Sequence, residues 1–316
     1  DYRTPPSWFE TPNIPSEVNF ESSNLPIVVI NTEQGQQIPN DPKINATMKI
    51  IYNANGQRNF LTDINNPSAL HYDGAIKIEY RGSSSSLLDK KQYAFTPYDD
   101  QGEKVNVSFL EMPKENDWIL NGLAYDPSFM RDYLSYKLSN LTGNYASRGR
   151  YCEVVLNGDF RGIYVLQEKL KADDSRIDIN KIKETDLSFP KLTGGYITKA
   201  DKNEGSDTPA WYMDSYGWGQ VNYIHEHPKP TTVKFQQNEY IKNEFEKLKV
   251  YASQGNSSIT TGYPSVIDIP SFVDFMILNE FASNADGYQF STFFHKDRNG
   301  KLRAGPIWDF NLTFGN

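Results

Sequence analysis

Short runs of β-branched and aromatic residues, separated by turn signals, dominate the first half of the chain. Such side chains suit the pleated, half-buried surface of a strand. Two of the runs, Glu153–Leu156 and Gly162–Leu166, flank Asn157-Gly158. That dipeptide favours a tight hairpin because both residues tolerate positive φ. We therefore expect this hairpin and, before it, strands at Leu25–Ile30, Thr47–Tyr52, Ala75–Tyr80 and Lys91–Thr96.

Helical spacing of apolar residues appears at three places. It predicts helices over Asp126–Leu141, over Glu239–Ala252 and from about Ser271 to Phe281. Asp268 is a cap candidate for the last of these, with Pro270 at an early helical position. Two other segments lack a clear period. We expect the charge-dense run Lys169–Lys183 to be a solvated helix or loop, and residues 201–223 to be irregular.

The order of these elements indicates the fold class. A strand-rich part followed by a helix-rich part predicts an α+β protein with two lobes, and ligands favour the cleft between such lobes. We expect an extended, proline-containing tether over residues 1–24. A strand-rich N-terminal lobe should follow over residues 25–170, and a helix-rich C-terminal lobe over residues 171–316.

The last segment of the chain carries the clearest candidate chemistry. Asp286 follows the third predicted helix, and a hairpin built from Gln289–His295 and Leu302–Trp308 leads to Asp309. A loop aspartate, a hairpin and a second aspartate form the order of parts in a protein-kinase-like phosphoryl-transfer site. Asp309 and Asn311 lie two residues apart and offer the oxygen ligands that Mg²⁺ and Mn²⁺ prefer. The alternative for all three residues is an ordinary role in turns or helix caps.

A phosphate group also needs a cation, which the strand-rich part can supply. Arg81 is followed by Gly82 and four serines, a donor-rich loop able to face a phosphate. Lys91 opens the next predicted strand. A solvated loop and an exposed lysine pair are the plain alternatives.

Composition narrows the function classes. The net charge of −8 argues against nucleic acid as a partner, which requires a basic surface. No run of 18 apolar residues is present, so we expect no membrane span. The single cysteine, Cys152, excludes an internal disulfide. Because the chain begins at Asp1 and opens with a proline-containing segment, we expect a protein that is exported, either extracellular or anchored at the cell surface.

Several short motifs, taken in order, resemble the spore coat protein H (CotH) kinase family. The similarity runs from about Leu25 to the end of the chain. Its pieces are Tyr80–Ser84, Lys90–Tyr93, Asp117–Gly122, Val154–Tyr164, Gln167–Lys169, Gly194–Tyr196, Asn284–Asp286 and Gly305–Phe310.

The resemblance implies an atypical protein-kinase-like fold and a Mg²⁺- or Mn²⁺-dependent transfer of the γ-phosphate of ATP to protein side chains, typically serine. It implies that Asp286 is the catalytic-loop aspartate, Asp309 the metal-binding aspartate and Lys91 the phosphate-contacting lysine. Glu168 and Lys169 match a recurring Glu-Lys pair. Its role, either nucleotide contact or bracing between lobes, stays open.

Two departures from the family pattern keep other functions open. Asn311 stands where many members have Asp, and Ser291 where some have Asn, so metal binding is expected to be weaker. The family pattern also continues past the Asp309 region, so the helical lobe is expected to be incomplete if the chain is a fragment.

One alternative is therefore a non-catalytic surface binding or adhesion module of the same fold. Another is a glycoside hydrolase that uses Asp286 and Asp309 as its carboxylate pair.

Overall fold

The computed structural model describes residues 18–82, 84–203, 208–215 and 219–316. Most of the predicted tether, residues 1–17, lies outside the described residues, as do Ser83 of the donor-rich loop and parts of the segment 201–223. The described chain is a mixed α+β protein with more strand than helix, as the sequence predicts for its class.

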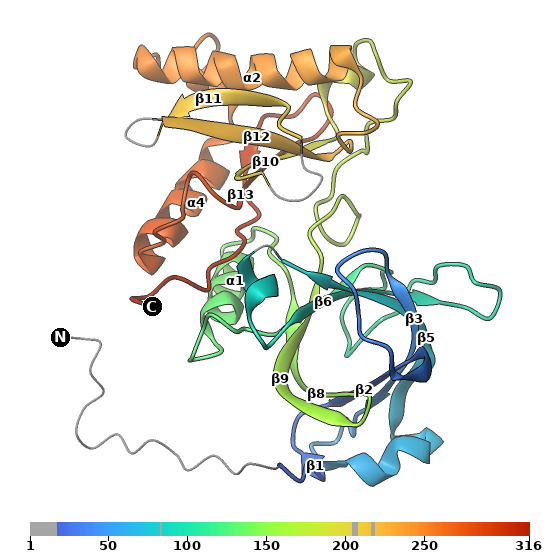
Figure 1. Cartoon of the computed structure of the whole chain (residues 1–316). Helices are drawn as coiled ribbons and strands as arrows, with labels where there is room; N and C mark the ends of the chain where they lie inside the picture. The colour runs from blue at the N-terminus through green and yellow to red at the C-terminus, as the bar shows by residue number, and fades with distance from the viewer. Residues whose placement is uncertain (1–17, 83, 204–207, 216–218) are drawn as a thin grey trace, which may run out of the picture.

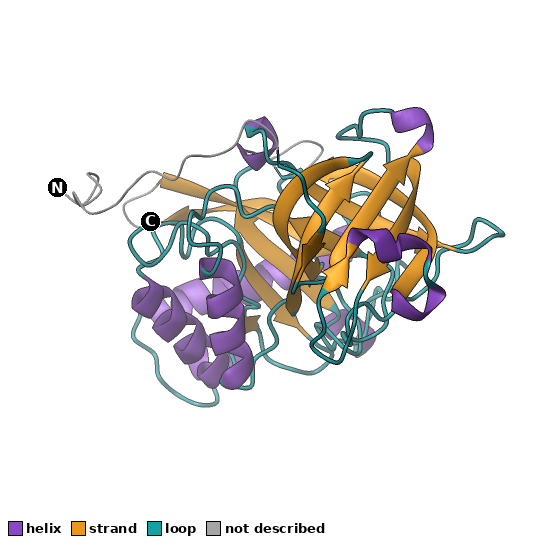
Figure 2. Cartoon of the chain, turned by 90° about the horizontal axis from the view of Figure 1, so that it is seen from below, coloured by secondary structure: helices purple, strands orange, loops and turns teal. Residues whose placement is uncertain are grey.

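The N-terminal strands close into a seven-stranded barrel (Figures 1 and 2). Six neighbouring pairs are antiparallel, and the barrel is closed by a parallel pairing in which Ile27 lies opposite Glu153 and Ile30 opposite Leu156. Closure removes the free edges that an open sheet would present. In spatial order the strands are β2 (Ile27–Thr32), β3 (Ile44–Ile51), β5 (Leu70–Arg81), β6 (Gln92–Tyr98), β7 (Trp118–Asn121), β9 (Asp159–Glu168) and β8 (Gly149–Leu156).

Large apolar side chains fill the inside of the barrel. Phe109 lies at their centre, with edge-to-face contacts to Phe95 and Trp118 at ring-centroid distances of 5.7 and 5.1 Å. Their burial agrees with the alternating burial along β3 and β5, whereas β6 and β7 are buried at nearly every position. The expected hairpin at Asn157-Gly158 is confirmed, with φ of 51° and 85° at the two turn residues.

A five-stranded sheet forms the core of the second part of the chain. Its strands, in spatial order, are β11 (Trp211–Ser215), β12 (Gly219–His227), β10 (Tyr196–Asp201), β13 (Thr292–Lys296) and β14 (Arg303–Ala304). Helix α2 (Phe235–Ser253) covers one face of it, where Ile241 and Phe245 pack on Trp211 and Tyr196 (Figure 1). The expectation of a mainly helical second half is thus only partly right.

Three further helices complete the main frame. They are α1 (Arg131–Leu141), α3 (Tyr263–Val266) and α4 (Ile269–Ala282). Helix α1 lies between the barrel and the second sheet, and it packs against α4 (Figure 1). The predicted cap of α4 is confirmed, because the Asp268 carboxylate accepts a hydrogen bond from the Ser271 N–H at 3.0 Å.

The remaining elements are short. Strands β1 (Ser22–Ser23) and β4 (Asn59–Phe60) pair with each other beside the barrel. Single 3-10 turns occupy Glu33–Gly35, Leu61–Asn65, Pro67–Ala69, Ser84–Leu87 and Lys191–Thr193. Among the described residues, none of the helices combines the length and the hydrophobicity needed to cross a bilayer.

Two expectations from the sequence are wrong. Residues 201–223 were expected to be irregular, but they contain β11 and most of β12, which pair in register with Trp211 stacked on Tyr223 at 5.3 Å. The run Lys169–Lys183 is a loop but is not solvated throughout. Apolar residues between its charges, Leu170, Ala172, Ile177 and Ile179, pack against Ile197 and Phe293. Cross-strand pairing and long-range packing override the local polarity in both cases.

The start of α1 also differs from the prediction. The helix begins at Arg131, five residues after Asp126. Asp126 instead caps the turn in front of it, accepting from the N–H of Ser128 at 3.0 Å and of Arg131 at 2.8 Å. A polar cap before a turn and a cap before a helix use the same side-chain chemistry, so the sequence alone did not separate them.

The half-buried imidazole of His295 yields a prediction about stability. Its Nδ1–H donates to the Gly305 carbonyl at 2.9 Å, and burial lowers its pKa to about 4. Between this value and the ordinary pKa near 6.5 the unfolded chain binds more protons than the folded one. We therefore expect the free energy of unfolding to fall as the pH drops from about 6.5 towards 4. His295→Gln, which keeps an N–H donor but cannot be charged, should show a shallower fall in chemical denaturation. Parallel pH profiles for the two proteins would contradict the assignment.

Candidate active site

A cavity of about 410 Å³ opens where the barrel meets the second sheet. Barrel residues on one side of it include Arg81 of β5 and Asn121 of β7. The other side carries Lys199 of β10 and Glu226 of β12, together with two loops that reach the cavity from the C-terminal segment.

Five of the seven predicted site residues line this cavity. They are Arg81, Lys169, Asp286, Asp309 and Asn311. The two aspartates therefore meet at one site, although the β13–β14 hairpin and its flanking loops separate them in the chain. Lys91 and Glu168 do not line the cavity.

Asp286 is held by the loop that ends α4. Ser283 adopts a left-handed conformation, which stops the helix, and the Asn284 side chain then accepts a hydrogen bond from the Asp286 N–H at 3.2 Å. The Asp286 carbonyl accepts from the Phe290 N–H at 3.0 Å. Gly287 fits closely here, since a Cβ at this position would lie 2.8 Å from the Asn279 amide oxygen. Within the described part of the chain the Asp286 carboxylate has no hydrogen-bond partner, which suits a base for a substrate hydroxyl.

Asp309 lies in a tight turn at the end of the second hairpin. Its φ is 61°, in the left-handed region that non-glycine residues seldom adopt. Its N–H donates to the Tyr136 hydroxyl at 3.1 Å, and its carboxylate accepts from the Asn311 amide at 2.5 Å. The neighbouring Trp308 stacks on Tyr136 at 5.8 Å and lies under the Arg81 guanidinium at 5.7 Å.

The carboxyl group of Asp309 faces the cavity, and the residue is exposed there. Partial desolvation by the surrounding protein raises its pKa, the Arg81 charge opposes this rise, and the negative charges of Asp201 and Asp286 add to it. A carboxylate whose charge is disfavoured in this way is a natural ligand for a cation.

Asp132, in the first turn of α1, is a cavity residue that the sequence did not reveal. It is buried, and burial followed by the nearby charge of Asp309 raises its pKa to about 7. One of its oxygens accepts from the Phe310 N–H at 2.7 Å and the other from the Asn121 amide at 3.2 Å. Acidic residues are common in the first turn of a helix, where they interact favourably with the helix dipole. The position of Asp132 therefore gave no local signal of a functional role.

The donor set fits a divalent metal ion that is completed by phosphate and water oxygens. Among the described residues no group of three or more His, Cys, Asp or Glu side chains is arranged to hold a metal. Mg²⁺ commonly binds through one or two carboxylates plus the phosphates of a nucleotide, so a complete protein cage is not required. Asp309 would hold such an ion, with Asn311 adjacent once its amide presents oxygen.

Basic side chains balance the acids of the cavity. Lys169 reaches it from the end of β9, and burial lowers the pKa of this lysine, against the effect of Asp117. Lys199 and Lys202 line it as well, and the Lys199 ammonium lies 3.3 Å from the Glu226 carboxylate and 3.6 Å from that of Asp201. No local pattern in the sequence marks these residues as part of a site. Lys199 and Asp201 lie two residues apart on β10 and so share one face of the strand. The sequence alone does not show that this face turns towards the cavity, because that depends on how β10 pairs with its neighbours.

Lys91 points elsewhere. Its ammonium donates to the Ser86 carbonyl at 2.8 Å and lies 5.7 Å from the Tyr80 ring centroid. These contacts fix the loop after β5. The phosphate contact expected of Lys91 therefore stays a prediction, and Lys169 is the better placed lysine.

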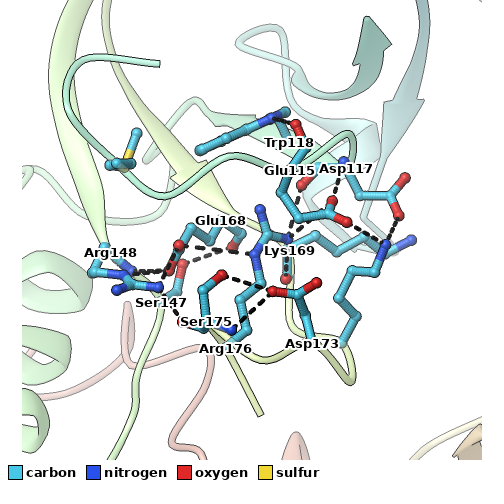
Figure 3. A network of polar contacts seen from close by, with 12 residues as sticks. Glu115, Asp117, Trp118, Ser147, Arg148, Glu168, Lys169, Asp173, Ser175 and Arg176 are labelled. Atoms are coloured by element: carbon cyan, nitrogen blue, oxygen red, sulfur yellow. Dashed lines mark hydrogen bonds and ion pairs between the residues drawn. The ribbon is translucent and has the colours of Figure 1, made fainter. Parts of the chain in front are cut away.

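Glu168 forms the centre of a buried polar network under the cavity (Figure 3). Its carboxylate is fully buried and accepts from the Arg148 guanidinium at 2.9 and 2.7 Å and from the Tyr145 hydroxyl at 3.1 Å. Arg176 adds a second guanidinium at 3.8 Å and donates to the Lys169 carbonyl at 2.7 Å. These are the contacts of a brace that joins the end of the barrel to the loop after it, and they hold the backbone of Lys169.

The sequence matches a known protein family over most of its length. The sequence model of the family described as "CotH kinase protein" matches residues 78–316. The chain therefore belongs to the CotH kinase family, as the resemblance in its motifs indicated, and is a kinase-like protein. A search among curated proteins found no match.

The brace around Glu168 can be tested by its effect on stability. Glu168→Gln removes the charge that pairs with two guanidinium groups and should lower the free energy of unfolding by about 3 kcal/mol, the usual scale for breaking a buried ion pair. Urea denaturation is the measurement. Glu103→Gln, at an exposed turn, is the matched control and should change stability by less than about 0.5 kcal/mol. Equal stability of the two variants would show that Glu168 is not a brace.

Proposed function

We propose that this chain is an ATP-dependent protein kinase that transfers the γ-phosphate of ATP to serine side chains of a protein, with Mg²⁺ or Mn²⁺. The observation that carries the proposal is the convergence of Asp286 and Asp309 on one cavity that is also lined by Arg81 and Lys169. Membership of a kinase family supports the same reaction class.

The proposed roles follow from what phosphoryl transfer requires. Asp309, with Asn311 beside it, would hold the metal ion, which when bound neutralises charge on the phosphates. Arg81 and Lys169 would contact phosphate oxygens from the barrel side. Asp286 would accept the proton of the attacking serine hydroxyl, which its unpartnered carboxylate is able to do. In this scheme the barrel and the second sheet act as the two lobes of a kinase-like fold.

The cations of the cavity favour this function over glycoside hydrolysis. Asp286 and Asp309 do share one cavity, as a carboxylate pair would. However, Arg81, Lys169, Lys199 and Lys202 line it too. A neutral sugar ring carries no charge for these cations to bind, whereas a triphosphate does.

The catalytic proposal predicts a large loss of activity for the two aspartates. Asp286→Asn removes the base and should lower the transfer rate by roughly 10² or more, the usual scale of general base catalysis. Asp309→Asn should abolish the dependence of the rate on Mn²⁺. The measurement is transfer of label from γ-labelled ATP to a serine-containing protein.

Asp159→Asn is the matched control, because Asp159 is an exposed residue of the β8–β9 hairpin. It should retain the wild-type rate. Equal transfer by wild type and Asp286→Asn would contradict the role of the base. Absence of transfer together with absence of Mg-ATP binding in calorimetry would favour the non-catalytic binding module.

A second prediction separates the two candidate lysines. Lys169→Met should raise the KM for ATP about 10- to 100-fold, because a hydrogen bond to a charged group contributes about 1.5–3 kcal/mol. Lys91→Met should leave the KM near the wild-type value, since its ammonium is engaged by the Ser86 carbonyl. Steady-state kinetics at varied ATP decides between them, and the reverse ranking would return the phosphate contact to Lys91.

A further inference from the structure

The conformation of Asp309 requires support from its surroundings. A φ of 61° places a non-glycine residue in a sparsely populated region of backbone space. Such a conformation persists where neighbouring groups fix it, and it is often found at functional sites. The groups that hold the Asp309 backbone in this conformation are therefore part of the site.

Two side chains of α1 bind consecutive N–H groups of this turn. The Tyr136 hydroxyl accepts from the Asp309 N–H at 3.1 Å, and the Asp132 carboxylate accepts from the Phe310 N–H at 2.7 Å. Asp132 and Tyr136 are four residues apart and so lie on the same face of the helix. Both side chains are buried, which makes each bond hard for water to replace.

Each of the two acceptors is itself held in place. The second oxygen of Asp132 accepts from the Asn121 amide at 3.2 Å, and Asn121 belongs to barrel strand β7. The Tyr136 ring stacks on Trp308 with an interplanar angle of 12°. The turn is thus connected through α1 to the barrel wall, which also carries Arg81, the cation that lies over the Trp308 ring.

We propose that Asp132 and Tyr136 are positioning residues that fix the Asp309 carboxylate at the place where the metal ion binds. The inference rests on the proposed role of Asp309. Without the two acceptors, the peptide groups on either side of Asp309 are free to rotate towards cavity water, φ relaxes to negative values, and the carboxylate leaves its place beside Asn311. Residues that orient a metal ligand in this way usually affect metal affinity strongly.

Tyr136→Phe is the direct test, because it removes only the hydroxyl acceptor and keeps the ring that stacks on Trp308. Tyr133→Phe, on the same helix and packed on Tyr151, is the matched control. We expect Tyr136→Phe to weaken Mn²⁺ binding about tenfold in calorimetry with a non-hydrolysable ATP analogue. In the transfer assay the concentration of Mn²⁺ for half-maximal rate should rise by a similar factor, with kcat largely recovered at saturating Mn²⁺. Tyr133→Phe should match the wild type in both.

A readout that does not depend on activity is amide hydrogen exchange. Exchange at Asp309 and Phe310 should accelerate in Tyr136→Phe and not in Tyr133→Phe. Unchanged Mn²⁺ affinity in Tyr136→Phe, while Asp309→Asn abolishes binding, would overturn the positioning role and leave the proposed function intact. Absence of Mn²⁺ binding in the wild type, with the analogue present, would instead overturn the proposed function and this role with it.

Discussion

The concentration of charge in a single cavity is the constraint on which the rest of the site depends. Asp132, Asp201, Asp286 and Asp309 line it, and desolvation, followed by repulsion from neighbouring carboxylates, raises the pKa of Asp132 and of Asp309. Basic side chains from both sides offset part of this cost, Arg81 among them. Clustered carboxylates with raised pKa values are typical of functional sites, where a bound ligand compensates the remaining charge. A metal ion bound to a polyphosphate has the required mixture of charges, which is why we propose nucleotide binding here.

The fold explains how residues far apart in sequence reach this cavity. The closed barrel supplies a rigid wall that ends at Arg81 and Lys169, and the Glu168 network fixes the chain where it leaves that wall (Figure 3). The second sheet supplies the facing wall through β10 and β12. Helix α1 lies between the two, and its buried polar side chains bind the turn that carries Asp309 (Figure 1).

Local signals in the sequence were sufficient to predict several secondary-structure elements and the order of the candidate site residues along the chain. The Asn157-Gly158 hairpin, the Asp268 cap and the sequence Asp286, hairpin, Asp309 all depend on residues close together in the chain. Barrel closure depends on a parallel pairing between distant strands, β2 and β8, which no local pattern encodes. Asp132 and Lys199 were missed for the same reason, because their significance comes from neighbours that only the tertiary structure provides. The choice of Lys169 over Lys91 likewise needed the direction of each side chain.

The most direct test of the account is a crystal of the protein soaked with Mn²⁺ and a non-hydrolysable ATP analogue. We expect an anomalous peak for Mn²⁺ in the cavity, at coordination distance from the Asp309 carboxylate and from phosphate oxygens, with Asp286 facing the γ-phosphate. A nucleotide bound outside this cavity, or a Mn²⁺ ion coordinated without Asp309, would contradict it.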